Sequence, residues 1–539
     1  MLSDIPGEAP DQHWAPAETS MFGQHVSECD RMTGVPEPAT VGAAISRNAE
    51  LRPESPAVVA SGLEPLSYGA LRDYLERVAT ELRQGGFDRA ARIAVALPNG
   101  AQAAMAIVAS ASAAVAVPID TQLTAPEIDR RLELLRPRAI IVPGECRSVA
   151  RSVAEHRGVA IIEASLKTPT KIGLELRVPT VCPSAAPEGP ETAAPAFILQ
   201  TSGTTGDPKL IPFSHCNMLA AAARVQSWFD LGPTDRCLSV SPVCYSHGLK
   251  VTVFIPLITG GSVAFPASVS TLDVHEWLTR LRPTWYSAAP TLHRYMLDKT
   301  ESLPDARSLH SLRFIVSGGA PLLWDVREAL ATALGVPVLE HYGSSEAAQI
   351  SANLPPPKPY RAGTCGIPPE GTIKIVGDDG QELPAGQQGE ILVGGLTVTS
   401  GYLDAPELNR LAFVDGWFRT GDVGSIDADG FLTLHGREKE LINRGGEKIS
   451  PVEVDQALLR HPEVAEAAAF AVPHPRLGED VAAAVVLRGG ATVTSLDLRK
   501  FLLSSLAQFK IPRRIVFVDG LPKGATGKVQ RKRLREFSK

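Results

Sequence analysis

The sequence lacks the cysteine and histidine spacings that build disulfide frameworks and zinc sites. Its seven cysteines are odd in number and scattered, and neither a C-x-x-C nor an H-E-x-x-H pattern occurs. Such usage is typical of reduced thiols in a cytosolic enzyme. We therefore expect a cytoplasmic protein without a disulfide framework or a zinc site.

An excess of positive charge is missing as well. The chain has 53 Lys and Arg against 59 Asp and Glu, and its formal net charge of −6 argues against a general nucleic-acid binder. The one basic run, residues 528–535, is predicted to be a solvated surface. We expect no nucleic-acid partner.

Long apolar segments are absent too. The acidic, proline-containing N-terminus has no apolar core of the kind found in signal peptides. The longest apolar stretch, residues 101–118, consists mostly of small side chains. It predicts a buried helix that runs into a strand, and we expect no membrane span.

The length of 539 residues predicts at least two domains. Residues 1–37 lack periodicity and are interpreted as a loose N-terminal extension. From 39 to 179, helical and strand patterns alternate, which predicts α/β layers around a largely parallel sheet. Shorter strands separated by turns predict a β-rich subdomain over 363–435. We place a large N-terminal domain at 38–436 and a small α+β domain, opened by a capping box at Ser450 and Glu453, at 437–539.

A loop rich in glycine and hydroxyl groups follows a short apolar strand. The segment TSGTTGDPK (residues 201–209) combines glycines that turn backbone N–H groups toward one point, three internal hydroxyls and Lys209. This set of donors suits a nucleotide polyphosphate, although the spacing is not that of the usual P-loop. Taken alone, the segment is also compatible with a plain flexible turn.

Five further segments occur with this loop in the order found in one known family. From residue 40 onward the chain resembles the adenylate-forming superfamily of acyl-CoA synthetases, peptide-synthetase adenylation domains and firefly-type luciferases. The six segments are TSGTTGDPK (201–209), SGGAPL (317–322), HYGSSEA (341–347), GWFRTGDVG (416–424), GREKELINRGGEKISPVEVD (436–455) and LPKGATGK (521–528).

The resemblance implies an ATP site spread over five of these segments. The first loop would wrap the β- and γ-phosphates, the second and third segments would line the adenine, and an Asp–Arg pair would grip the ribose hydroxyls. The implied ATP-binding residues are Thr201, Ser202, Gly203, Thr204, Thr205, Gly206, Lys209, Gly318, Gly319, Ala320, His341, Tyr342, Gly343, Ser345, Asp422 and Arg437.

Two residues are implied to be catalytic. Glu346, together with Thr204, would hold Mg²⁺, and Lys528 would be the lysine of the first half-reaction. Ser345 would touch the α-phosphate, where the family more often has threonine. Each assignment has a structural alternative when taken singly: Glu346 as a carboxylate at a helix N-terminus, and Lys528 as one more solvated lysine.

The resemblance also implies a mobile C-terminal domain. Lys439 would be its hinge, and the loop 523–528 would carry Lys528 into the site and out again. Gly445 and Gly446 would lie on the strand past which the pantetheine of CoA threads.

The sequence alone does not identify the carboxylic acid that would be the substrate. The segment SPVCYSHG (241–248) has no Asp to hold an amino group, which argues against an α-amino acid. Tyr245 replaces the histidine that many CoA ligases have here, and His247 follows two residues later, so the two are rival pocket candidates. The chain looks nearest to the oxalate–CoA ligases. That subgroup, however, has arginine near Val316 and histidine near Gln349, and losing both partners for a second carboxylate predicts a less charged, bulkier acid.

The predicted function is an AMP-forming acyl-CoA synthetase with ATP, Mg²⁺ and CoA. The acid pocket is predicted to contain Tyr245, His247, Trp285, Val316 and Gln349. No carrier-protein segment follows Lys539, so we expect the acceptor to be a free thiol or a separate protein. Two alternatives stay open: an acyl-AMP ligase that loads a separate carrier protein, and a non-catalytic nucleotide-binding relative.

Overall fold

The computed structural model describes residues 39–144, 147–166, 171–181, 193–201, 208–269, 273–300, 303, 305–445, 447–524 and 529–538. Residues 38–539 form one compact unit. The predicted N-terminal extension, residues 1–37, lies outside the described residues.

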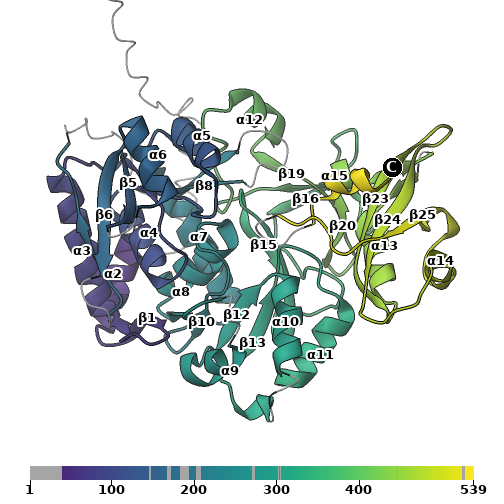
Figure 1. Cartoon of the computed structure of the whole chain (residues 1–539), viewed down its shortest axis with the longest axis horizontal. Helices are drawn as coiled ribbons and strands as arrows, with labels where there is room; N and C mark the ends of the chain where they lie inside the picture. Colours follow the sequence, from purple (N-terminus) through teal and green to yellow (C-terminus); the bar gives the residue numbers. More distant parts are fainter. Residues whose placement is uncertain are drawn as a thin grey trace, which may run out of the picture. The chain divides into compact units, whose positions relative to one another are not determined.

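Two large sheets form the framework of the N-terminal domain (Figure 1). The 7-stranded sheet has the order β7 (Leu174–Arg177), β6 (Ala160–Leu166), β5 (Ala139–Pro143), β3 (Arg92–Val95), β4 (Val115–Pro118), β8 (Pro195–Gln200), β9 (Leu210–Ser214). The 8-stranded sheet has the order β15 (Ala348–Ala352), β14 (Val338–Ser344), β13 (Phe314–Ser317), β12 (Trp285–Ala288), β10 (Arg236–Leu238), β11 (Ser262–Phe265), β1 (Pro56–Ala60), β2 (Leu66–Ser67).

Both sheets are parallel in their interiors and end in antiparallel edge strands. β7 and β9 run antiparallel to their neighbours in the first sheet, as do β2 and β15 in the second. Central strands such as β5 are apolar almost throughout and buried on both faces, as expected of parallel strands covered by helices. The predicted largely parallel α/β architecture is confirmed.

Helices cover both faces of each sheet, which gives five layers. The main core between the sheets is filled from α2 (Val41–Leu51), α3 (Tyr68–Gln84), α4 (Ala101–Ala113), α7 (His215–Phe229), the π-helical η2 (His247–Phe254) and α8 (Ile255–Ile258). The outer face of the 7-stranded sheet packs on α5 (Ala125–Leu135) and α6 (Val149–Arg157). The outer face of the 8-stranded sheet packs on α9 (Val274–Glu276), η3 (Trp277–Leu281), α10 (Pro290–Thr300) and α11 (Trp324–Leu334).

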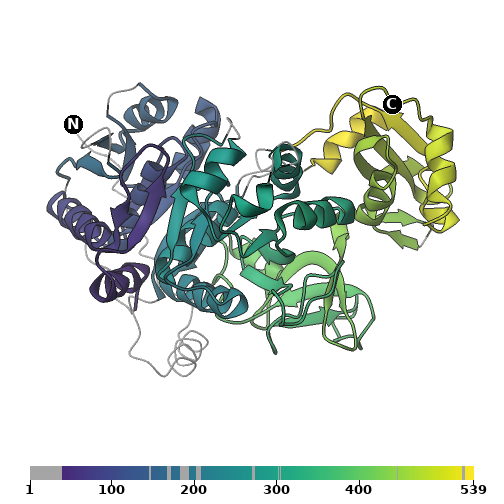
Figure 2. The same ribbon diagram turned by 90° about the horizontal axis from the view of Figure 1, so that it is seen from below.

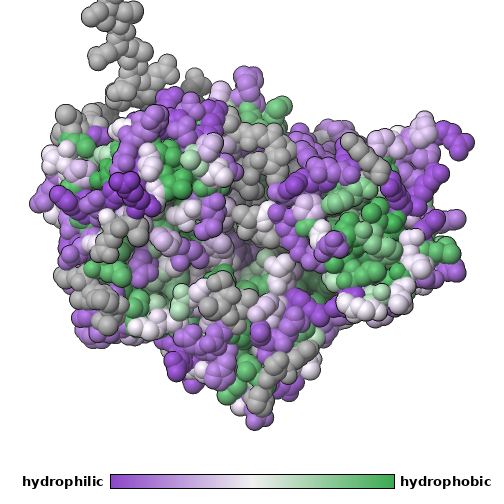
Figure 3. Space-filling view, in the orientation of Figure 1, coloured by the Kyte–Doolittle hydropathy of each residue, from purple (hydrophilic) through white to green (hydrophobic). Residues whose placement is uncertain are grey.

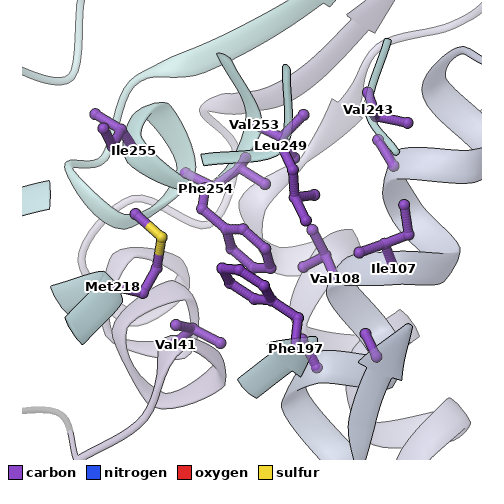
Figure 4. Packing of buried hydrophobic residues seen from close by; sticks show 14 of the residues in the cluster. Val41, Ile107, Val108, Phe197, Met218, Val243, Leu249, Val253, Phe254 and Ile255 are labelled. Atoms are coloured by element: carbon purple, nitrogen blue, oxygen red, sulfur yellow. The ribbon is translucent and has the colours of Figure 1, made fainter. Parts of the chain in front are cut away.

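The main core is tightly packed around η2. Leu249, Val253 and Phe254 of this segment meet Phe197 of β8 and Val108 of α4 (Figure 4). The rings of Phe197 and Phe254 stack with centroids 5.2 Å apart. The segment is therefore fixed between the two sheets.

A smaller antiparallel sheet corresponds to the predicted β-rich subdomain. Its 5 strands are β16 (Ile373–Val376), β17 (Gly389–Val393), β19 (Trp417–Ile426), β18 (Phe413–Val414) and β20 (Leu432–Arg437), with α12 (Pro406–Ala412) before β18. The register pairs Asp422 of β19 with Arg437 of β20.

The C-terminal part contains a second 5-stranded sheet. Its strands are β22 (Glu447–Ile449), β21 (Ile442–Arg444), β24 (Gly478–Leu487), β23 (Val464–His474) and β25 (Arg514–Phe517), which pairs with β24. The helices are η5 (Glu438–Glu440), α13 (Pro451–Leu459), α14 (Ser495–Leu502), η6 (Gln508–Lys510), α15 (Arg531–Leu534) and η7 (Arg535–Ser538). These elements, yellow-green to yellow, pack on one another in Figure 2 and have a core of their own.

The prediction for the apolar stretch 101–118 is confirmed, and the prediction of a capping box at Ser450 is confirmed only in part. The apolar stretch 101–118 is α4 followed by β4, and among the described residues no helix is long and apolar enough to cross a membrane. Ser450 caps α13 by accepting a hydrogen bond from Glu453 N at 3.3 Å. The capping box is incomplete, however, because the Glu453 carboxylate pairs with Lys510 Nζ at 2.7 Å.

Candidate active site

The two ends of the nucleotide loop are held together at its base. Thr201 N donates to Lys209 O at 3.1 Å, and Lys209 N donates to Thr201 Oγ1 at 3.1 Å. This ladder continues the antiparallel pairing of β8 and β9. The intervening candidates lie outside the described residues: Ser202, Gly203, Thr204, Thr205 and Gly206.

A chain of hydrogen bonds links Lys209 to Glu346. Glu346 lies in the turn between β14 and β15, and its Oε1 accepts from Tyr402 OH at 2.8 Å. Lys209 Nζ donates to Tyr402 OH at 3.2 Å and lies 4.5 Å from the ring centroid. The predicted phosphate lysine and the predicted magnesium carboxylate are therefore brought together through one tyrosine.

Burial and nearby charges shift the pKa values of Lys209 and Tyr402. Burial lowers the pKa of Lys209, the Glu346 carboxylate opposes that shift, and the cations Lys439 and Arg437 reinforce it. Burial, aided by the same carboxylate, raises the pKa of Tyr402, so its phenol stays protonated and can donate. The region brings the Glu346 carboxylate together with the cations Lys209, Lys439 and Arg437, of which Arg437 is paired with Asp422, and such an arrangement suits a polyanionic ligand bound with a metal ion.

The turn that carries Glu346 is fixed from two sides. Lys250 of η2 donates from Nζ to Ser345 O at 2.7 Å, and Thr399 N donates to Glu346 O at 2.7 Å. Lys250 is fully buried, and its Nζ lies 3.6 Å from the ring centroid of Phe213 on β9. Burial lowers the pKa of Lys250 to about 7, while the Glu346 carboxylate acts to raise it.

Asp422 is held by Arg437, its partner in the predicted ribose pair, and by Tyr342, a predicted adenine residue. Arg437 Nε lies 3.0 Å from Asp422 Oδ1, and Tyr342 OH donates to Asp422 Oδ2 at 2.6 Å. The nearby Asp422 carboxylate is the main cause that raises the pKa of Arg437. The segments containing Tyr342, Asp422 and Arg437 thus meet at one point.

The adenine candidates form a close backbone approach. Gly318 is buried, and a Cβ added to it would lie 2.2 Å from His341 Nε2. A Cβ on Gly343 would lie 2.4 Å from Ala348 O. Gly319, with a φ of +83°, and Ala320 are exposed beyond the end of β13. Glycine is therefore required at 318 and 343 for these strands to pack as they do.

The predicted acid-pocket residues fall into two groups. Trp285 and Val316 lie on neighbouring strands, each 1% exposed, and Trp285 stacks on Phe314. The His247 ring lies 5.5 Å from that of His341, whose pKa burial lowers to about 3. His341 is therefore neutral throughout the physiological range.

Tyr245 and Gln349 have more specific environments. Tyr245 OH donates to Asp120 Oδ2 at 2.6 Å, so the side chain that replaces the usual histidine is tied to a different loop. Gln349 is 6% exposed, and its Oε1 has no hydrogen-bond partner among the described residues. Its backbone oxygen accepts from Arg224 at 2.9 Å.

The C-terminal candidates are described only in part. Lys439 lies in η5, directly after β20, and is exposed. Gly445 lies in the turn between β21 and β22 with a φ of +64°, so it is not a strand residue as predicted but the hairpin turn itself. Gly446 and Lys528 lie outside the described residues.

The described residues fit Mg²⁺ and ATP. A carboxylate in a turn offers the hard oxygen ligands that Mg²⁺ prefers, and Lys209 adds a point charge for a phosphate. Glu346 would hold the metal ion and Lys209 a phosphate oxygen.

Sequence reasoning missed Tyr402 and Lys250. Asn409 fixes Tyr402 through two hydrogen bonds, accepting from its N at 2.7 Å and donating to its O at 2.8 Å, so the spacing of Tyr402 and Asn409 was a usable signal. Lys250 is the single charged residue in the apolar run 248–258, which is itself unusual.

Comparison with known proteins agrees with this geometry. The AMP-binding enzyme family matches residues 45–403, and the AMP-binding enzyme C-terminal domain matches residues 453–528. The oxalate–CoA ligase of Arabidopsis thaliana is 34% identical over 502 residues, 92% of this chain and 97% of that protein. The sulfoacetate–CoA ligase of Cupriavidus necator is also 34% identical, with the same coverage. The crystal structure of ATP-bound MatB from Rhodopseudomonas palustris superposes with a TM-score of 0.81 at 28% identity, covering 93% of this chain and 99% of MatB.

The chain belongs to the AMP-binding enzyme family, which is the adenylate-forming superfamily predicted from its motifs. The predicted class, an AMP-forming acid–thiol ligase, is confirmed, as is the fold with a large N-terminal and a small C-terminal domain. CoA ligases of this family use ATP, Mg²⁺ and CoA, the set predicted for this chain.

Proposed function

We propose that the chain is an ATP-dependent acyl-CoA synthetase. It would join a carboxylic acid to the α-phosphate of ATP, release pyrophosphate, and pass the acyl group from acyl-AMP to the thiol of CoA. The observation that carries the proposal is the Lys209–Tyr402–Glu346 chain. In a chain of this family, it links Lys209, predicted to bind a phosphate, to Glu346, predicted to bind Mg²⁺.

The main obstacle in the first half-reaction is repulsion between two anions. At about 4 Å, two unit charges repel by roughly 1 kcal/mol in water and by roughly 4 kcal/mol at an effective dielectric near 20. A closed site therefore needs cations. Mg²⁺ at Glu346 would neutralise charge on the phosphate oxygens. Lys209 supplies a fixed ammonium, and Lys528 is proposed to bring a second one.

The second half-reaction requires room for a thiol. We propose that the C-terminal domain, residues 437–539, turns about Lys439, so that Lys528 leaves and the hairpin turn at Gly445 takes its place. The exposed position of Lys439 directly after β20 supports a hinge at this point. The boundaries 38–436 and 437–539 belong to this proposal.

The acid is proposed to be non-amino, bulkier than oxalate and without a second charge. None of the five pocket candidates is lysine or arginine, and His341 stays neutral. The named relatives act on oxalate and sulfoacetate, each of which carries a second acidic group. The resemblance implies that oxalate–CoA ligases have an arginine near Val316 and a histidine near Gln349, so a second carboxylate would lack these partners here.

A panel of carboxylic acids, read by pyrophosphate release with and without CoA, tests the substrate proposal. We expect bulky monocarboxylic acids to exceed oxalate by at least about tenfold in kcat/KM, because an unpaired buried charge costs more than 1.4 kcal/mol. A preference for dicarboxylic acids would contradict it. Arg224, which already contacts the Gln349 backbone, would then be the cation to examine.

The acceptor and the location are part of the proposal. Thioester formation with CoA, compared with a purified carrier protein, separates a CoA ligase from an acyl-AMP ligase. Substrate-dependent exchange of pyrophosphate into ATP separates both from a non-catalytic relative. The scattered cysteines support a cytoplasmic location.

A further inference from the structure

A fully buried lysine stands between the nucleotide loop and the turn of the candidate magnesium carboxylate. Lys250 is 0% exposed and lies in η2, whose residues Leu249, Val253 and Phe254 pack in the main core (Figure 4). An ammonium group has three donors and a strong preference for water. Burying this lysine in an otherwise apolar run therefore lowers the stability of the folded protein. A role in the site would explain why the residue is found there.

The contacts of Lys250 reach both sides of that site. Its Nζ donates to Ser345 O at 2.7 Å, one residue before Glu346. The same Nζ lies 3.6 Å from the ring centroid of Phe213, on the strand that leaves the nucleotide loop. Hydrogen bonding and the contact with an aromatic face stabilise a desolvated ammonium in one place.

The turn itself has little else to define its shape. Ser344 Oγ accepts from Ala347 N at 3.0 Å within the turn, and Thr399 N holds the Glu346 carbonyl from the β-rich subdomain. Lys250 holds the preceding carbonyl from the opposite side. The direction of the Glu346 side chain follows from these two neighbouring peptide groups and from the hydrogen bond that its carboxylate accepts from Tyr402 OH, so losing one of the three loosens the carboxylate.

We propose that Lys250 is a positioning residue that aims the Glu346 carboxylate at the metal ion bound with ATP. This inference rests on the proposed function only in taking Glu346 as the Mg²⁺ ligand. Lys250 contacts no substrate. It acts through the Ser345–Glu346 peptide, whose carbonyl oxygen accepts from Lys250 Nζ.

The test is a double-mutant cycle on Mg·ATP binding, measured by titration calorimetry. Lys250→Met keeps the shape of the side chain and removes both the donor and the charge. We expect it to weaken Mg·ATP binding about tenfold, because residues that share one hydrogen-bond network couple at this level. In a Glu346→Gln background the same substitution should change the affinity less than about twofold.

Two further variants guard against a trivial loss of folding. Lys299→Met removes an exposed lysine that likewise faces an aromatic ring, that of Tyr295, and it should leave binding unchanged. Lys250→Gln keeps a donor without the charge and should recover part of the affinity lost by Lys250→Met. If Lys250→Met does not fold, the cycle is run with Lys250→Gln.

Equal weakening in the native and Glu346→Gln backgrounds would overturn the inference, as would unchanged binding in Lys250→Met. If the native protein binds Mg·ATP but none of the acids tested supports exchange of pyrophosphate into ATP, the proposed function alone would be overturned. The double-mutant cycle on Mg·ATP binding could still be measured. If the protein does exchange pyrophosphate but the effects of Lys250→Met and Glu346→Gln on Mg·ATP affinity are additive, the inference alone would be overturned.

Discussion

At the scale of single residues, Tyr402 holds the candidate site together. Its ring supports the Lys209 ammonium, and its hydroxyl donates to Glu346 while accepting from that lysine. Without the hydroxyl, the Lys209 ammonium and the Glu346 carboxylate would have no group between them and could form a direct ion pair. The tyrosine therefore keeps both groups available for a ligand.

Tyr402→Phe should slow adenylation about tenfold, because a hydrogen bond to a charged group is lost. The measurement is acid-dependent pyrophosphate exchange. Tyr360→Phe is the matched control, since the buried Tyr360 hydroxyl has no partner among the described residues and only its ring faces Arg327. An equal effect of both substitutions would exclude a specific role for Tyr402.

The residues of the site could be predicted only where they belong to contiguous motifs. Thr201 stands in a loop whose composition indicates phosphate binding, and Glu346 and Asp422 stand in segments that resemble motifs of the family. Tyr402 and Lys250 do not, because their roles depend on contacts with residues that are distant in sequence and close only in the folded chain. The partner of Tyr245, Asp120, is 125 residues away for the same reason.

At the scale of elements, α10 is fastened to the strand that precedes it by a buried histidine. His293 Nε2 donates to Ala288 O at 3.1 Å, which leaves Nδ1 to accept from Tyr286 OH at 3.3 Å. Burial lowers the pKa of His293 to about 4. The helix is thus held on the sheet by a neutral imidazole, and protonation would leave Tyr286 without its acceptor.

This contact predicts a loss of stability in mild acid. Between pH 6.5 and 4 the unfolded chain binds a proton at His293 that the folded protein excludes, so the free energy of unfolding should fall as the pH falls. The contribution of His293 should fall by about 2 kcal/mol from about pH 7.5 to about pH 5. Denaturant unfolding at several pH values measures it. The slope should be shallower in His293→Gln and unchanged in the exposed-residue control His275→Gln.

Element prediction succeeded where pattern and capping residues agreed. Ser67 is a residue type that favours helix N-caps and Gly85 one that favours helix ends, and α3 begins after Ser67, which accepts from Ala70 N, and ends before Gly85. The error at α13 has a physical cause. Glu453 can either close the capping box or pair with Lys510, and the lysine, 57 residues away, offers the stronger charge-assisted bond. The turn at Gly445 was taken for a strand because β21 and β22 are only three residues long each.

At the scale of the whole molecule, the proposed reaction depends on one domain serving two steps. The contacts that cross residue 437 are modest. Lys448 Nζ lies 3.4 Å from Asp378 in an exposed ion pair, and such pairs contribute little to stability. Apolar side chains gather over the C-terminal domain on the face shown in Figure 3, in a surface that is otherwise mainly hydrophilic. The ion pair and the apolar surface do not oppose rotation, whereas the hydrogen bond that Ser450 Oγ donates to His435 O also crosses residue 437 and would have to break.

Lys528→Ala should lower the rate of adenylation by about 10²–10³-fold, comparable to removing one preorganised donor. Formation of the thioester from supplied acyl-AMP should stay nearly normal. The control is Lys523→Ala in the same loop, which loses only an ion pair with Glu466. Equal loss in both half-reactions would argue that Lys528 supports the fold and does not enter the site.

The pairing of β19 with β20 has a mechanical consequence. It sets Arg437 opposite Asp422, and a single residue, Glu438, separates that arginine from Lys439. A twist of the backbone at Lys439 is therefore transmitted at once to the guanidinium opposite Asp422. In the proposed mechanism, ribose binding by Asp422 and Arg437 would therefore be coupled to rotation of the C-terminal domain about Lys439, and AMP should be released when that domain rotates back.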